Sequence, residues 1–78
     1  MAKKAVILAE MRSRIASGEA KRLRLAHRLT LGEVADDVGV TASAVHAWEA
    51  GAYLPNGPHA LAYADLLREL SWVDHEPA

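Results

Sequence analysis

The spacing of helix caps in residues 30–51 is the feature that most limits how this chain can fold. Thr30 is followed three residues later by Glu33, the pattern of a capping box, and Gly39 comes where such a short helix must end. Thr41 can cap a second helix, and Gly51 follows its last turn. The sequence therefore predicts two short helices joined by a tight glycine turn, over residues 31–37 and 41–49.

Composition favours helices throughout the chain and a single core. Of the 78 residues, 16 are Ala and 10 are Leu, whereas Phe is absent and only two Ile and six Val are present. The β-branched and aromatic residues from which sheets are usually built are therefore scarce. A chain of this length buries about 60% of its unfolded surface, which is too little for two separate cores. We expect an all-α fold, a compact bundle of about five helices.

Three more helices are predicted outside the central pair. Apolar residues at helical spacing predict an amphipathic N-terminal helix over residues 4–16. Its default role is to pack on its own domain; the alternatives are pairing with a second subunit and contact of its basic residues with a DNA backbone. Ser17 is the expected N-cap of a second helix over residues 19–28, although a weak break there would give one long helix. Pro58 suits the first turn of a final helix over residues 59–70, whose wide apolar band can pack on the domain and on a second copy. The predicted organisation is a basic helix in 1–18, the main domain in 19–71 and a tail in 72–78.

The same periodicity predicts the core. Val45 and Trp48 should face inward from one helix and Tyr63 from the last one. Ala35 is small where the two central helices must cross, and three valines fill the space beneath them, Val34, Val38 and Val40. His27 is expected at the edge of the core. Trp72 is open to two interpretations, a dimer contact or an intramolecular lid.

Charge is unevenly distributed along the chain, although the net charge is only −1. Residues 1–28 hold eight basic and two acidic side chains, whereas residues 29–78 hold one basic and eight acidic ones. Solvated helix faces would explain this pattern. So would a basic N-terminal half that meets a polyanion while the acidic half faces away.

Several functional classes find no support in the sequence. Without Cys there are no disulfides or thiolate ligands, and the histidines form no metal-binding pattern, so neither a metal nor a cofactor is expected. The longest apolar run, residues 5–9, is far shorter than the roughly 20 residues of a membrane span, and the charges after it do not suit a cleaved leader. No phosphate-binding loop or nucleophile motif suggests an enzyme. A cytoplasmic protein of the bacterial nucleoid, with no membrane partner, is expected.

The stretch Leu29–Gly51, LTLGEVADDVGVTASAVHAWEAG, resembles the Cro and phage-repressor type of helix-turn-helix domain, also called the XRE family. The resemblance covers about residues 19–70. Its landmarks are Arg24, Leu29-Thr30, Glu33-Val34-Ala35, Gly39-Val40-Thr41, Val45, Trp48-Glu49, Gly51, Pro55 and Tyr63-Ala64. The resemblance implies a lambda-repressor-like DNA-binding fold in which the helix after Thr41 enters the DNA major groove.

Carried over by position, the resemblance implies which residues meet DNA. The base-facing candidates are Ala42, Ser43, Ala44, His46 and Ala47. The phosphate-facing candidates are Lys21, Arg22, Arg28, Thr30, Leu31, Thr41 and Tyr53, with Leu31 contributing its backbone N–H. Lys3, Lys4, Arg12 and Arg14 should add phosphate attraction. Arg24 is expected to pair with Glu49, since an anion in the last turn of a helix needs a nearby cation.

The expected recognition helix departs from the family pattern. Its base-facing positions commonly carry Gln, Arg, Lys or Asn, but here they offer mostly methyl groups, so base readout should depend on Ser43, His46 and DNA shape. The alternative for His46 is a plain exposed surface position without a base contact. One such domain should bind weakly, which favours a homodimer on a palindromic operator.

The sequence therefore predicts a small sequence-specific regulator of transcription that binds double-stranded DNA, a repressor of bacterial, phage or plasmid type. The alternative is a protein-interaction module on the same scaffold, such as an antitoxin subunit or accessory factor. A third interpretation is nonspecific nucleoid binding.

Overall fold

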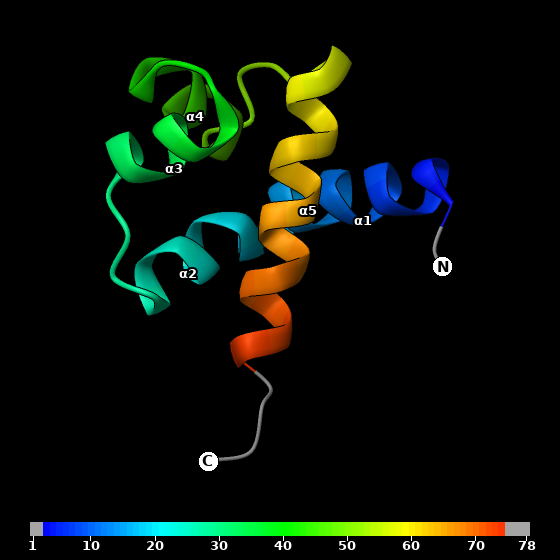
Figure 1. Ribbon diagram of the computed structural model, residues 1–78, viewed down its shortest axis with the longest axis horizontal. Helices are drawn as coiled ribbons and strands as arrows, with labels where there is room; N and C mark the ends of the chain where they lie inside the picture. The colour runs from blue at the N-terminus through cyan, green and yellow to red at the C-terminus, as the bar shows by residue number, and fades with distance from the viewer. Residues whose placement is uncertain (1–2, 75–78) are drawn as a thin grey trace.

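The computed structural model describes residues 3–74, with side chains described for residues 3–72. In chain order the helices are α1 Lys4–Ser17, α2 Glu19–Ala26, α3 Leu31–Val38, α4 Ala42–Glu49 and α5 Gly57–Asp74. Within this described part there is no strand, and the predicted all-α class is confirmed. Helix α5 runs through the middle of the molecule, with α3 and α4 beside its N-terminal half, α2 beside its C-terminal half and α1 crossing behind it (Figure 1).

All five helices contribute to one core. The predicted core residues Val34, Ala35, Val38, Val45, Trp48 and Tyr63 are buried, while Val40, in the turn, is only half-buried. The rings of Trp48 and Tyr63 lie 4.9 Å apart at an angle of 47°. Met11 and Ile15 bring α1 into the same core, so α1 packs on its own domain.

The predicted break between α1 and α2 is confirmed, but it is formed by Gly18 and not by Ser17. Gly18 has a φ of 83°, and its N–H donates to the carbonyl of Ile15 at 3.2 Å. This left-handed residue ends α1 and also stands at the N-cap of α2, where Ser17 was predicted. The Ser17 hydroxyl still accepts a hydrogen bond from the N–H of Glu19, at 3.3 Å.

Two other helix boundaries differ from the prediction. Helix α2 ends at Ala26 instead of Arg28, because Arg28 adopts a φ of 56° and cannot continue a right-handed helix. Helix α5 was predicted over 59–70 but runs from Gly57 to Asp74, since no Gly or Pro interrupts residues 71–74. Trp72 therefore lies on α5. Residues 75–78 of the predicted tail lie outside the described residues.

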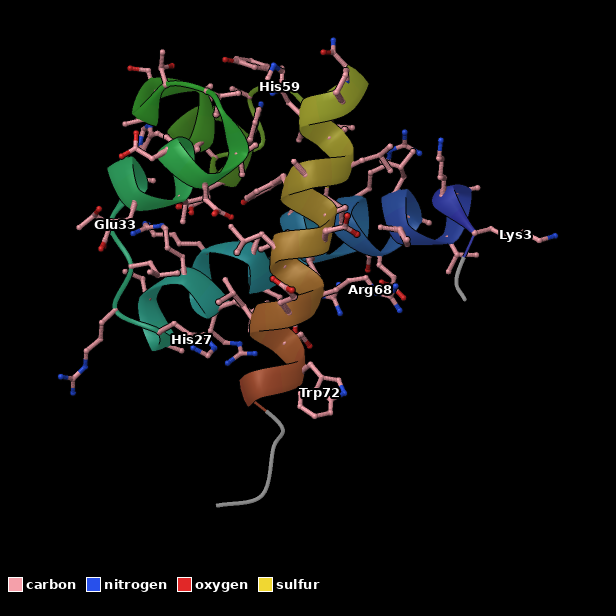
Figure 2. All side chains as sticks on the ribbon, viewed as in Figure 1. Lys3, His27, Glu33, His59, Arg68 and Trp72 are labelled. Carbon is pink, nitrogen blue, oxygen red and sulfur yellow. The ribbon has the colours of Figure 1, made fainter. Side chains whose placement is uncertain are left out.

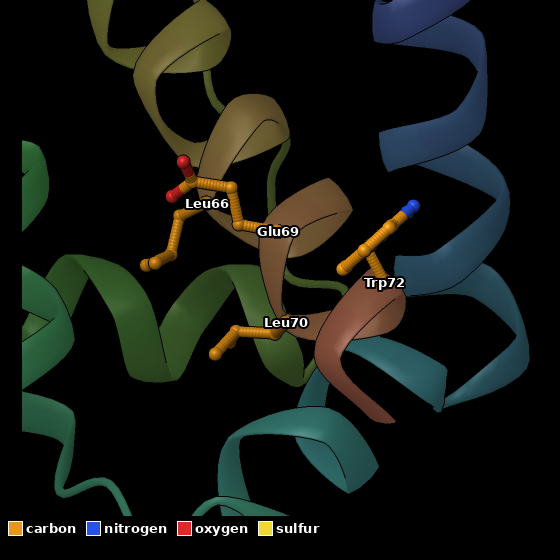
Figure 3. A pocket seen from close by; sticks show the side chains of 4 residues that line it. All are labelled: Leu66, Glu69, Leu70 and Trp72. Carbon is orange, nitrogen blue, oxygen red and sulfur yellow. The ribbon is translucent and has the colours of Figure 1, made fainter. Parts of the chain in front are cut away.

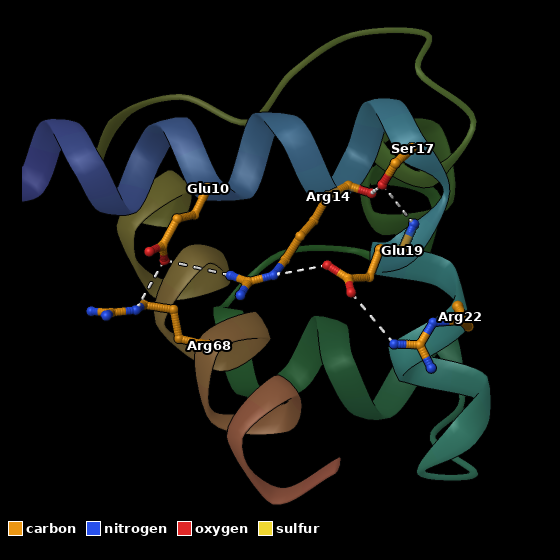
Figure 4. Close-up of polar contacts among 6 residues, drawn as sticks. All are labelled: Glu10, Arg14, Ser17, Glu19, Arg22 and Arg68. Atoms are coloured by element: carbon orange, nitrogen blue, oxygen red, sulfur yellow. Dashed lines mark hydrogen bonds and ion pairs between the residues drawn. The ribbon is translucent and has the colours of Figure 1, made fainter. Parts of the chain in front are cut away.

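A chain of alternating charges joins α5, α1 and α2 on the surface (Figure 4). Arg68 of α5 lies 3.0 Å from Glu10 of α1, which lies 3.6 Å from Arg14. Arg14 donates to Glu19 of α2 at 3.2 Å, and Arg22 donates to the same carboxylate at 3.4 Å. Arg14, expected to attract phosphate, is thus largely buried between two carboxylates. The more exposed pairs, Arg22 with Glu19 and Arg68 with Glu10, contribute about 0–1 kcal/mol each.

Candidate nucleic-acid interface

The turn between α3 and α4 is held by caps on both sides. Thr30 and Glu33 form the predicted capping box: the Thr30 hydroxyl accepts from the Glu33 N–H at 3.0 Å, and the Thr30 N–H donates to the Glu33 carboxylate at 2.8 Å. Gly39 ends α3 with a φ of 88°. Thr41 caps α4 by accepting from the N–H of Ala44 at 3.2 Å. These local bonds determine where α4 begins.

Helix α4 turns its two large apolar side chains inward and its small ones outward. Val45 and Trp48 are buried, whereas Ala42, Ser43 and His46 are exposed. The remaining two predicted base-facing residues are half-buried, Ala44, which packs against the core, and Ala47. The open surface of α4 therefore offers one hydroxyl, one imidazole and methyl groups, and it has no long polar side chain.

An ion pair anchors the C-terminal end of α4 to α2. Arg24 donates from Nε to Glu49 Oε2 at 2.6 Å and from Nη2 to Glu49 Oε1 at 3.0 Å. The side chains of Arg24 and Glu49 are only 11% and 4% exposed. The hydrogen bond to Glu49 raises the pKa of Arg24 above its usual value. Arg24 and Glu49 thus lie together as the sequence led us to expect, and their bidentate geometry restricts the angle of α4 to the rest of the domain.

The same guanidinium also holds the loop that leads into α3. Nη1 of Arg24 donates to the carbonyl of Leu29 at 2.9 Å, and the Leu29 N–H donates to the carbonyl of Arg24 at 3.0 Å. A single side chain therefore positions the start of α3 and the end of α4 together.

The predicted phosphate-facing residues are all on the surface except Leu31, which is half-buried. Lys21 of α2 shares a small hollow of about 90 Å³ with His46, next to the Arg24–Glu49 pair. Arg28, Thr30, Thr41 and Tyr53 are exposed. Arg22 is exposed but pairs with Glu19. Lys3, which precedes α1, is more remote: Lys3 and Glu33 of α3 lie at opposite sides of the molecule (Figure 2).

A family model described as a helix-turn-helix domain matches residues 16–70. The chain belongs to this helix-turn-helix family. The match covers α2 to α5 up to Leu70 and leaves most of α1 outside it. Membership supports a role as a DNA-binding regulator, in agreement with the Cro-type resemblance. No curated protein and no solved structure matches the chain.

No helix in residues 3–74 is both long and apolar enough to cross a membrane. No group of three or more His, Asp or Glu side chains within that part of the chain is placed to hold a metal ion.

Sequence reasoning missed the role of two histidines. His59 of α5 donates from Nδ1 to the carbonyl of Val38 at 3.3 Å, at the C-terminal end of α3. His27 donates from Nε2 to the carbonyl of Leu70 at 3.0 Å, which ties the end of α2 to α5. Both bonds join residues more than 20 positions apart, so no local pattern could have revealed them. Placing His27 at the edge of the core was as far as periodicity could go.

Proposed function

We propose that this helix-turn-helix protein is a sequence-specific transcriptional regulator that binds a palindromic DNA operator as a homodimer. The observation that carries the proposal is the placement of α4: its outer surface is open, its inner surface is packed by Val45 and Trp48, and its end is anchored by Arg24. A rigid helix of this kind can enter the major groove without reorganisation.

The chemistry of α4 suggests how bases are read. The Ser43 hydroxyl can donate or accept, and the His46 imidazole can bond a purine edge, while Ala42 can contact a thymine methyl. None of these makes the two-pronged contact of Arg with guanine. Readout therefore depends partly on DNA shape, and the affinity of one protomer is low. Two protomers are needed for the affinity of about 10⁻⁸ M or better that specific regulators reach.

Selection of bound DNA from a random duplex library tests this proposal. We expect an enriched sequence with two-fold symmetry and half-sites about one helical turn apart. His46→Ala and Ser43→Ala should each relax the preference at one position per half-site by about 1 kcal/mol, the contribution of a single hydrogen bond. Asp36→Ala, which alters an exposed α3 side chain outside the predicted contacts, is the control and should leave the motif unchanged. Recovery of no motif would reject specific binding.

The protein-interaction module remains the second candidate because of the charges near α4. Arg14 and Arg22 are already paired with carboxylates, and Asp36 and Asp37 are exposed on α3. Such a surface is less basic than the sequence alone suggests. A chain that shifts no duplex at low salt would favour this candidate, whereas shifts of every duplex without an enriched motif would favour nonspecific nucleoid binding.

A further inference from the structure

The C-terminal half of α5 carries an exposed aromatic side chain beside two hollows. Trp72 is 69% exposed, more than any other large apolar side chain in the described part of the chain. One hollow, of about 440 Å³, is lined by Leu66, Glu69, Leu70 and Trp72 (Figure 3). The other, of about 390 Å³, is lined by Asp65, Arg68, Glu69 and Trp72.

The residues around the second hollow form a stripe along α5 that is complementary to itself. Asp65, Arg68, Glu69 and Trp72 recur at helical spacing and share one face. Consider a second α5 laid antiparallel against this stripe, so that Arg68 lies opposite the partner's Glu69. Asp65 then lies opposite the partner's Trp72, because both pairs are centred between residues 68 and 69.

Each pair in this register has matching chemistry. Arg68 brings a cation to a carboxylate, and it can do so while bound to its own Glu10, because a guanidinium has five N–H donors. The indole N–H of Trp72 is a donor and the Asp65 carboxylate an acceptor. A surface that matches itself about a two-fold axis is what an isologous dimer interface requires.

We propose that this α5 stripe, residues 65, 68, 69 and 72, is the interface between two antiparallel copies of the chain. Trp72 of each copy lies over the partner's stripe, and Leu66 and Leu70 add apolar surface at the edge through the first hollow. A stripe of four residues with two leucines at its edge is far fewer than the roughly 20–30 residues per side of a stable complex, so the dimer is weak without DNA.

The register also determines where the recognition helices lie in the dimer. Gly57, the first residue of α5, is about 11 residues from the centre of the stripe, and a helix rises about 1.5 Å per residue. The first residues of the two α5 helices are then roughly 34 Å apart along the helix direction. Because α4 lies beside the N-terminal half of α5 (Figure 1), the two α4 helices lie toward opposite ends of the dimer, as two half-sites on one duplex require. This last step rests on the proposed function, whereas the interface itself does not.

Sedimentation of the full chain without DNA, over a wide range of concentrations, tests the interface. We expect reversible dimerisation that Trp72→Ala weakens by about 30-fold or more, because Trp72 is the largest apolar side chain of the stripe and each dimer loses two copies of it. Trp72 is exposed, so its removal should leave the thermal melting curve unchanged. Arg12→Glu, a charge reversal at an exposed position on α1, is the matched control and should leave dimerisation unchanged.

A mixing experiment tests the register. Arg68→Glu and Glu69→Arg should each dimerise more weakly than the parent, because each places like charges opposite one another. An equal mixture of the two variants should recover dimerisation as a heterodimer, since both charge pairs are then opposite in sign. Circular dichroism of each variant checks that loss of the Arg68–Glu10 pair leaves the fold intact.

A parent chain that stays monomeric at every concentration, or a Trp72→Ala chain that dimerises like the parent, would overturn the interface. A mixture that fails to recover would overturn the register. If the mixture recovers but DNA selection yields no motif, the proposed function fails and the interface stands. If DNA selection yields a palindrome while Trp72→Ala dimerises normally, the inference fails and the function stands.

Discussion

At the residue scale, Arg24 and Glu49 contribute more to the fold than any exposed pair. Both side chains are nearly buried and bonded at 2.6 and 3.0 Å, so removing one leaves the other uncompensated. We expect Glu49→Ala to destabilise the domain by about 3–5 kcal/mol and to lower its Tm by at least about 12 °C. Arg12→Ala, which removes an exposed arginine, should change stability by less than about 0.5 kcal/mol. Equal melting curves for the two variants would contradict this role.

Tyr63 contrasts with the paired Arg24 and Glu49. Its hydroxyl is buried without a hydrogen-bond partner among the described residues. Burial raises the pKa of Tyr63, and the charge of Glu49 raises it further. We expect Tyr63→Phe to leave stability unchanged or to increase it by up to about 1 kcal/mol, since it removes an unpaired polar group. Tyr63→Ala should instead cost about 3–5 kcal/mol, because the contact with Trp48 is lost. Chemical denaturation measures both, and a loss above about 1 kcal/mol in Tyr63→Phe would be the contrary result.

At the element scale, the α3–α4 turn depends on the backbone of Gly39. A Cβ there would lie 3.7 Å from the His59 ring, an ordinary contact, so the cost of Gly39→Ala comes from its φ of 88° and should be about 1–2 kcal/mol. Gly32→Ala is the matched control: Gly32 lies inside α3, and Ala there should stabilise the domain by about 0.5–1 kcal/mol. Thermal melting should therefore shift in opposite directions, and shifts of the same sign would refute the assignment.

Some features of the helices could be predicted from the sequence, and others could not. The capping box at Thr30, the glycine turn and the burial of Trp48 were predicted because each depends on a few neighbouring residues or on one helical period. The end of α5, the pair of Glu10 with Arg68 and the bond from His59 to Val38 were not. These depend on how helices distant in sequence pack, and a helix end without Gly or Pro has no local signal.

At the scale of the whole molecule, the basic N-terminal half has fewer unpaired cations than the sequence suggests, because several of its arginines bind carboxylates. Of the eight cations in residues 1–28, Arg14, Arg22 and Arg24 are paired with carboxylates. Lys21, near His46, and Arg28, next to the start of α3, are then the cations best placed for phosphate beside α4, whereas Lys3 lies across the molecule from Glu33 (Figure 2). The position of a cation thus matters more than the number of cations.

This placement predicts the salt dependence of DNA binding. Two such cations in each of two protomers give four phosphate contacts, so log K should fall with log salt at a slope of about −3.6. Lys21→Ala and Arg28→Ala should each reduce the slope by about 2, because each removes two contacts per dimer. The double variant Lys3→Ala with Lys4→Ala should leave it unchanged. Mobility shifts at graded salt measure the slope, and a slope that depends on the α1 lysines instead would place α1, rather than α2, against the DNA backbone.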